Sequence, residues 1–491
     1  MYKLVRKLVR NISKAIIITL CASSALHPLQ DNEKTALTLR DHQLRAANFT
    51  TFHELQTKKE KKFGAKFQNG YFYRETENSE KLGEVFGTCD TNKIIVGTEL
   101  QVAAELADVE NNFILHYHSS PNTLEGIVEF NPKQTSHGTI AETFMKLDRL
   151  LKGLYLKKKV VIMEVENSLN AKVYNKEPGA AATEAQLLSD VLAGKNLKRN
   201  LGGGASDRYS EQEALEYAKI GCPDETRTGI ENLETTIGWH FIRHDDYMAG
   251  INIALQSPTG DRTTAEYLWE PRLGSQHWAL GGGIEGKVTA WKDENQSIRV
   301  FLDINYRYEF EAKEKRTLGI KNAGPLNHYI LLGEVGKYML YPAANILTKE
   351  IDVTPGSNLD ALLVLNYNFK KFTFDLGYNF FYKVEEDVEL NRCLWTDDKY
   401  GIADPSWTTC NSAFTLADTF PANTPINYDD IDTSVAQSPG MLSHSIFASA
   451  GYSAKIWNSP IMLALGGAYE FSGSRGTAKS FTIWGKAGFA F

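Results

Sequence analysis

Charged residues alternate with apolar residues in several segments of the chain, and they form the first candidate site. Successive side chains of a β-strand point to opposite faces, so each of these segments would have one charged face and one apolar face. Facing hydrocarbon at mid-membrane would cost an Arg or Lys about 2–4 kcal/mol, so we expect these residues to line the inside of a barrel. They are Arg299, Asp303, Arg307, Glu309, Glu285, Lys287, Asp360, Asp375 and Lys383. Such a face offers a polar path for a solute, or else a plugged interior held together by Arg–Asp pairs.

A second arrangement could carry enzyme chemistry. Residues 116–120 read H-Y-H-S-S, which places His118 two residues before Ser120. A histidine can activate a serine nucleophile, although a catalytic set also needs a third group that orients the histidine. The pair resembles part of the H-x-S-N-G pattern of outer-membrane phospholipases, but Pro121 interrupts that pattern. We therefore predict that the protein is not an enzyme and keep a phospholipase as the weaker alternative.

The elements that must position the charged residues are strands. The last twelve residues have the clear two-residue alternation of a strand. Residues 480–491 read S-F-T-I-W-G-K-A-G-F-A-F. Phe481, Ile483 and Phe489 fall on one face, whereas Thr482, Trp484 and Lys486 fall on the mostly polar face. A strand of about 12 residues, tilted by about 40°, rises roughly 30 Å, which matches the apolar band of an outer membrane. Outer-membrane barrels typically end on such a strand with a terminal Phe.

Similar alternation recurs along the chain and predicts an all-β fold, a closed antiparallel transmembrane barrel of 12 to 14 strands with long external loops and small helical inserts. The connections at one end are short, such as 244–246 and 370–371. We expect the barrel to occupy residues 63–491, with long inserts at 77–135, 168–229, 314–357 and 386–442. Short periplasmic turns and long external loops are typical of transmembrane barrels. Residues 93–99, 113–118 and 124–130 could be two further wall strands or loop structure, and residues 183–192 and 210–219 are expected to be helical.

The N-terminal residues have the features of an export signal. Five basic residues precede the short apolar core at residues 15–22, and Ser23, Ser24 and Ala25 offer a cleavage site. We expect residues 1–25 to be a signal peptide and residues 26–62 to be a periplasmic lead-in. Removing five positive charges would take the formal net charge from −7 to −12, which argues against nucleic acid as a partner. The chain has no apolar run of about 18 residues that could form a transmembrane helix.

Four cysteines would remain after cleavage, at positions 89, 222, 393 and 410. Cys393 and Cys410 lie in one polar stretch, and an exported protein can oxidise them, so we predict that they form a disulfide in an external loop. The partners of Cys89 and Cys222 stay open. The spacing of Cys and His residues matches no metal site, and we expect neither a metal nor a cofactor.

Residues 228–262 carry a resemblance to a known family. Gly229, Asn232 and Leu233 lie in one predicted strand, and after a tight turn the next strand ends in Pro258-Thr259-Gly260. This stretch of about 35 residues resembles the strand–turn–strand of FadL-like and MetA-pathway phenol-degradation-like outer-membrane transporters. The chain differs from that family in its long insert at residues 168–229 and in the absence of an N-terminal hatch motif. The resemblance implies passive entry of hydrophobic or aromatic small molecules.

The sequence therefore predicts an outer-membrane channel or transporter for small solutes. The expected partners are outer-membrane lipid, the solutes themselves and the barrel-assembly machinery. The alternative is a surface adhesin or structural barrel that acts through its external loops. The identity of the solute, the openness of the lumen and the oligomeric state stay open.

Overall fold

A computed structural model describes most of the region from residue 64 onward and one short segment before it. The described residues are 34–40, 64–77, 80–88, 91–97, 109–110, 126–175, 188–195, 211–221, 225–324, 326–404, 413–456, 459–474 and 477–490.

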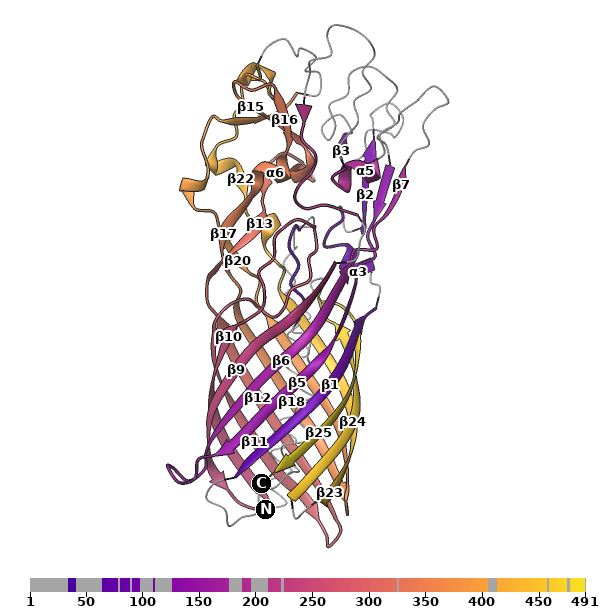
Figure 1. Ribbon diagram of the computed structural model, residues 1–491, viewed down its shortest axis with the longest axis vertical. Coiled ribbons are helices and arrows are strands. Elements are labelled where there is room, and N and C mark those ends of the chain that lie inside the picture. The colour runs from indigo at the N-terminus through magenta and orange to yellow at the C-terminus, as the bar shows by residue number, and fades with distance from the viewer. Residues whose placement is uncertain are drawn as a thin grey trace.

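Twelve antiparallel strands form the wall of a closed barrel (Figure 1). In chain order they are β1 (Ala65–Thr76), β5 (Lys133–Lys146), β6 (Leu154–Ser168), β9 (Glu225–Arg243), β10 (Tyr247–Pro258), β11 (Ala279–Lys292), β12 (Gln296–Glu309), β18 (Gly356–Phe369), β19 (Phe372–Lys383), β23 (Met441–Ile456), β24 (Ser459–Ser472) and β25 (Ser480–Ala490). Each strand pairs with its neighbours along the chain, and β25 closes the ring by pairing with β1. The structure confirms the predicted fold class, with 12 strands rather than 14.

The outer face of the wall is apolar, as the alternation predicts. In β25, Phe481, Ile483 and Phe489 are exposed, whereas Thr482, Trp484 and Lys486 between them are buried. Large aromatic side chains project outward near the strand ends: Trp239, Phe241, Trp278, Tyr306, Tyr308, Tyr382 and Phe471. Such residues typically form the girdle at the boundary between membrane and water.

The connections at the two ends of the barrel differ in length, with the short β24–β25 connection at residues 473–479 as the exception. At one end, short turns join β5 to β6, β9 to β10, β11 to β12, β18 to β19 and β23 to β24. The long connections all leave the opposite end, and their small sheets stand above the barrel (Figure 1). This end, where the loops gather, is called the mouth from here on.

The long connections fold into small sheets of their own. One group consists of β13 (Ala312–Thr317), β17 (Thr348–Thr354) and β20 (Asp387–Glu389), and another of β14 (Gly319–Ile320) and β22 (Ile431–Asp432). A third contains β21 (Tyr400–Ile402), β15 (Leu331–Glu334), β16 (Met339–Pro342) and β8 (Glu211–Gln212). The fourth contains β3 (Val109–Glu110), β2 (Lys93–Gly97), β4 (Gly126–Glu129) and β7 (Lys172–Asn175).

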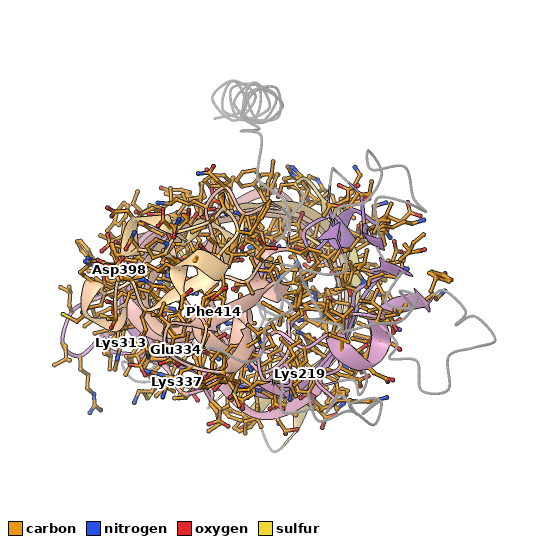
Figure 2. The ribbon with its side chains drawn as sticks, turned by 90° about the horizontal axis from the view of Figure 1, so that it is seen from above. Lys219, Lys313, Glu334, Lys337, Asp398 and Phe414 are labelled. Atoms are coloured by element: carbon orange, nitrogen blue, oxygen red, sulfur yellow. The ribbon has the colours of Figure 1, made fainter. Side chains whose placement is uncertain are left out.

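The described helices are short. They are α3 (Glu80–Gly83), α5 (Leu188–Leu192), α6 (Ala343–Leu347) and the 3-10 turns η2 (Asn327–Tyr329), η3 (Arg392–Leu394), η4 (Leu416–Asp418), η5 (Tyr428–Asp430) and η6 (Ser434–Ala436). Among the described residues, none is long and apolar enough to cross a membrane. Figure 2 looks down on the loops, with Glu334, Lys337 and Phe414 on one side and Lys219 apart from them. Phe414 is fully buried and lies so close to Gly333 that a Cβ there would come within 2.3 Å of its ring.

Two expectations for the inserts are settled by these contacts. The strand-like residues 93–99 and 124–130 contribute β2 and β4 to a loop sheet rather than to the barrel wall. The helix predicted for residues 210–219 is wrong, because the backbone N–H groups there bond to other segments. Glu213 donates to Leu340, Glu216 donates to the side chain of Asn345, and Ala218 has a positive φ of 54°. The other segment predicted to be helical is residues 183–192, and its described part contains the helix α5.

The residues behind the family resemblance pack around one inward loop. A Cβ on Gly229 would come within 2.8 Å of the Leu273 side chain, and one on Gly260 within 2.1 Å of the Leu273 carbonyl. A Cβ on Gly274 of the loop would come within 2.5 Å of the Asn232 side chain. Asn232 lies beside a bulge where β9 shifts its register on β6. The small residues of the pattern therefore let the β10–β11 connection fold down against the wall.

Candidate functional site

The nine charged residues singled out from the sequence occupy inward-facing positions of four adjacent strands. Arg299, Asp303, Arg307 and Glu309 lie on β12, Glu285 and Lys287 on β11, Asp360 on β18, and Asp375 and Lys383 on β19. Their exposed neighbours, such as Tyr306 and Ile284, face outward. Lining a solute path stays a prediction for these nine, whereas their contacts are described by the structure.

Near the mouth the inward charges form ion pairs between adjacent strands and between strands two or three apart along the wall. Glu234 on β9 is paired with Arg307 and, at 3.3 Å, with Lys159 on β6. Glu309 lies 3.4 Å from Lys383 and accepts a hydrogen bond of 2.8 Å from Asn358. Opposite charges therefore satisfy one another at this level instead of facing open water.

Deeper in the barrel the acidic side chains are held by neutral donors and by histidine. Glu285 accepts a 2.6 Å hydrogen bond from the Tyr155 hydroxyl and lies 2.9 Å from His240. Asp375 accepts hydrogen bonds from Asn366 and Ser449 at 2.6 and 2.8 Å. The lumen wall thus remains polar below the paired charges.

A polar cavity of about 60 Å³, enough for a few water molecules, lies just inside the mouth. Its lining includes four of the nine predicted residues, namely Arg307, Glu309, Asp360 and Lys383. Other lining residues are Leu37 and Arg40 from the N-terminal segment, Trp269 and Arg272 from the β10–β11 connection, and Glu231 from β9. The cavity is therefore built jointly by the wall and by segments that enter from the mouth.

The N-terminal segment at residues 34–40 is one of these. Arg40 is buried and lies 3.1 Å from Glu470 on β24 and 3.3 Å from Asp360 on β18, and it also covers the ring of Phe381 at 4.5 Å. Glu470 also binds Arg74 on β1 at 2.7 Å. We expected a periplasmic lead-in over residues 26–62, but residues 34–40 lie inside the barrel near the mouth. The buried carboxylates of the wall account for the difference, because they supply the partners that a buried arginine needs.

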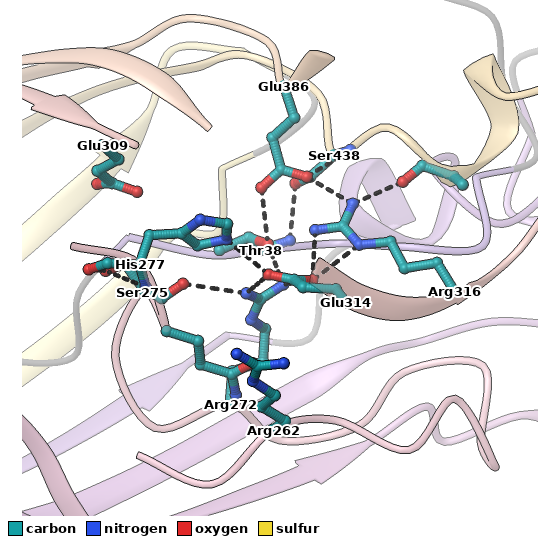
Figure 3. A network of polar contacts seen from close by, with 12 residues as sticks. Thr38, Arg262, Arg272, Ser275, His277, Glu309, Glu314, Arg316, Glu386 and Ser438 are labelled. Atoms are coloured by element: carbon teal, nitrogen blue, oxygen red, sulfur yellow. Dashed lines mark hydrogen bonds and ion pairs between the residues drawn. The ribbon is translucent and has the colours of Figure 1, made fainter. Parts of the chain in front are cut away.

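Above the cavity, a buried network of ion pairs ties the loops together (Figure 3). Glu314 on β13 accepts hydrogen bonds from Arg272 at 2.6 and 3.1 Å and from Arg316 at 2.9 Å. Arg316 also bonds Glu386 at 2.6 Å, and Glu386 accepts a 3.2 Å bond from the Ser438 backbone. The network therefore joins the β10–β11, β12–β18 and β19–β23 connections, and we call it the mouth network.

Two further contacts extend the mouth network. His277 lies 2.8 Å from Glu314 through Nε2 and 2.7 Å from the Phe310 carbonyl through Nδ1. His277 therefore bridges the β13 carboxylate and the backbone at the end of β12. Thr38 of the N-terminal segment accepts a hydrogen bond of 3.2 Å from Arg272, and its backbone N–H donates to Ser438 at 2.8 Å.

Charge pairing in the mouth network outweighs the cost of burial. Burial alone would raise the pKa of Glu314, but Arg272 and Arg316 hold that pKa well below the usual value of 4.5. Burial opposes ionisation of Glu386 as well, yet Arg316 and Lys383 lower its pKa. Both carboxylates are therefore ionised at neutral pH.

These two shifts predict how the mouth responds to acid. Carboxylates with a lowered folded-state pKa stabilise the fold above the unfolded value of 4.5, and that stabilisation disappears as the pH falls through the folded value. Hydrogen exchange of residues 312–317, corrected for the intrinsic rate, should show constant stability from pH 7 to about 5 and a loss beginning below about pH 4.5. A loss centred near neutral pH would contradict this assignment.

An apolar cluster occupies inward positions of the wall together with Leu273 of the β10–β11 connection, and sequence reasoning missed it. Its members are Phe72, Ile140, Val161, Met163, Val165, Leu273, Phe301, Leu362, Val364, Phe447, Ala468 and Trp484. They come from opposite walls of the barrel, since four strands separate β25 from β12 on one side and six on the other. We call this set the apolar lumen cluster. Its signal in the sequence was weak, because the strands that take part contribute only one to three members each, such as Trp484 in a largely polar face.

Several predicted residues fall outside the described part of the chain. These are His118, Ser120, Cys89, Cys222 and Cys410. Cys393 is exposed at η3, and the Cys393–Cys410 disulfide stays a prediction.

No protein-family model and no curated protein matches the chain. Among solved structures, it is similar to an outer membrane channel from Pseudomonas putida F1, with 11% identity, 87% of this chain and 96% of that chain covered, and a TM-score of 0.38. It is also similar to the Pseudomonas putida toluene transporter TodX, with 8% identity, 94% and 98% coverage, and a TM-score of 0.32. A Pseudomonas aeruginosa FadL homologue matches with 8% identity, 87% and 90% coverage, and a TM-score of 0.29.

The closed antiparallel wall, its apolar outer face and its polar, ion-paired lumen define the class of this protein. It is a transmembrane β-barrel of the outer-membrane type.

Proposed function

We propose that the protein is an outer-membrane channel that admits small, mainly hydrophobic solutes, aromatic ones among them, by passive diffusion. The apolar lumen cluster is the observation that carries the proposal. It lies inside the barrel, where a water-filled pore would be lined with polar side chains, and it spans opposite walls below the polar cavity. A solute that enters would leave the polar mouth and make contact with aromatic and aliphatic side chains.

The same arrangement disfavours ions. An ion that passes the apolar lumen cluster loses part of its hydration to side chains that offer it no polar partner, which costs free energy. The inward charges near the mouth already have partners, as Glu234 has in Arg307 and Lys159. We infer a selective path for uncharged solutes rather than a general porin, in line with the resemblance of residues 228–262 to hydrophobic-solute transporters.

Paired assays of conductance and uptake test this function. Uptake of a labelled aromatic compound should be measured in vesicles with a lipopolysaccharide leaflet, and ion conductance in planar bilayers. We expect uptake to require the protein and conductance to be small. Any residual conductance should become more cation-selective in Arg299→Glu, which changes the lumen charge by two units. Large conductance without aromatic uptake would contradict the proposal.

The ordered loops favour one other candidate, a surface adhesin. Loop residues form a core of their own around Leu318, Leu332, Ile351 and Trp395, so they present a stable surface above the mouth. Deleting the β15–β16 hairpin should leave uptake intact if the protein is a channel. If the wild type shows neither uptake nor conductance, and deletion of the hairpin abolishes adhesion of cells that display the protein, the adhesin would be the better interpretation. Lipase activity dependent on Ser120 would instead favour the enzyme.

A further inference from the structure

Trp484 is the one member of the apolar lumen cluster that carries a strong hydrogen-bond donor. It faces inward from β25, it is 5% exposed, and its ring centroid lies 6.5 Å from that of Phe447. The indole lies flat against β24 at Gly466, where an added Cβ would come within 2.5 Å of two ring carbons and 2.7 Å of Nε1. The contact with the backbone of β24 fixes the orientation of the ring and of its N–H group.

The indole N–H of Trp484 has no acceptor in the described part of the protein. An indole nitrogen can only donate, and a buried donor without a partner costs about 1–3 kcal/mol. Nearly all buried polar groups in proteins are paired, so an unpaired one calls for an explanation. Two hydroxyls at inward positions of β23 and β25, those of Ser445 and Thr482, also have no partner among the described residues. Ser445 lies two residues before Phe447 on β23, and Thr482 two residues before Trp484.

We propose that Trp484 sets solute specificity by donating a hydrogen bond from Nε1 to an acceptor oxygen on the passing solute. This inference rests on the proposed channel function and names its substrate class. The class is a small apolar molecule that carries an uncharged oxygen acceptor, such as an aryl ketone or an ester. Its apolar body packs among Phe72, Phe447 and the other members of the cluster, and its oxygen satisfies the buried donor.

The chemistry of the site excludes other classes. A pure hydrocarbon leaves the N–H unpaired and so gives up the contribution of that hydrogen bond. A cation meets the positive edge of the indole donor. A solute that offers only donors finds no acceptor on Trp484. Binding sites built to hydrogen-bond a ligand discriminate strongly against analogues that lack the group.

Acetophenone and ethylbenzene test the proposal directly, because they share a carbon skeleton and differ by a carbonyl in place of a methylene. The first measurement is binding. The protein, labelled with ¹⁵N at its indoles and held in detergent micelles, is titrated with each compound. The Trp484 signal is identified by its absence in Trp484→Phe. Acetophenone should shift this signal saturably and to a larger extent than ethylbenzene does, because only the ketone offers an acceptor.

The second measurement is competitive uptake of the two compounds in lipopolysaccharide-containing vesicles. The wild type should favour acetophenone about 5-fold, which corresponds to one net hydrogen bond. In Trp484→Phe, which keeps an aromatic ring over Gly466 but lacks the donor, the ratio should fall toward one. Trp239→Phe is the matched control, because Trp239 faces outward and donates instead to the Lys152 carbonyl at 3.1 Å. That change should leave the ratio as it is.

The outcomes separate this inference from the channel function. Equal ratios in the wild type and Trp484→Phe would overturn the role of Trp484 while leaving the channel intact. An indole signal that responds equally to both compounds would also overturn it, since a bound water would then be the partner of the N–H. If neither compound is taken up, the channel function fails, and the titration still reports whether Trp484 binds the ketone.

Discussion

In a Glu314→Ala variant, the loop assembly above the mouth should lose about 3–5 kcal/mol of local stability. Glu314 is the shared acceptor of Arg272, Arg316 and His277, and its side chain is almost fully buried. Removing it leaves cationic side chains buried without their counter-ion, which is far more costly than losing an exposed pair. Hydrogen exchange of residues 312–317 and 348–354 measures the change as a lowered free energy of opening.

Glu350→Ala is the matched control for this variant. Glu350 lies on β17, beside β13, and its contact with Lys313 at 4.0 Å is largely solvent-exposed. Exposed pairs contribute at most about 1 kcal/mol, so the same amides should exchange nearly as in the wild type. Equal effects of the two substitutions would show that the mouth network does not hold the loops together.

The second large effect is expected for Glu470→Ala inside the barrel. This carboxylate joins Arg40 of the N-terminal segment to Arg74 of the wall, at 3.1 and 2.7 Å, and all three side chains are buried. Its loss should destabilise the barrel by about 3–5 kcal/mol, measured by urea unfolding in detergent, because two buried arginines lose their shared partner. Residues 34–40 should also become more accessible to hydrogen exchange, since Asp360 would then be the one carboxylate still paired with Arg40 among the described residues.

Glu164→Ala provides the comparison on the outer face. Glu164 pairs with His137 at 3.3 Å, and both side chains are about 40% exposed. We expect a change below about 1 kcal/mol and no change in the exchange of residues 34–40. If Glu470→Ala were equally mild, Arg40 would not anchor the segment, and its burial would need another cause.

The strands of the barrel wall could be predicted from the sequence, because the alternation of inward and outward side chains is visible within each strand segment. Residues 298–312 show which side chains point inward without any knowledge of their partners, since alternation is a property of the backbone. The sorting of short and long connections placed the turns at one end and the loops at the other, and it fixed the strand count within 12 to 14. These features survive in the structure because each depends on residues a few positions apart.

The pairing of the inward residues was decided by the tertiary structure. Which residues of different strands share a level of the lumen depends on strand tilt and stagger around the closed ring, which no single segment encodes. Arg307 therefore meets Glu234 on β9, and Trp484, on a largely polar face, joins an apolar cluster that reaches β12. The position of residues 34–40 could not be predicted from the sequence either, because Arg40 pairs with Asp360 and Glu470, which are more than 300 positions away in the chain. The period of a strand is thus set by its own backbone, whereas the site inside the barrel arises from long-range contacts among strands, loops and the N-terminal segment.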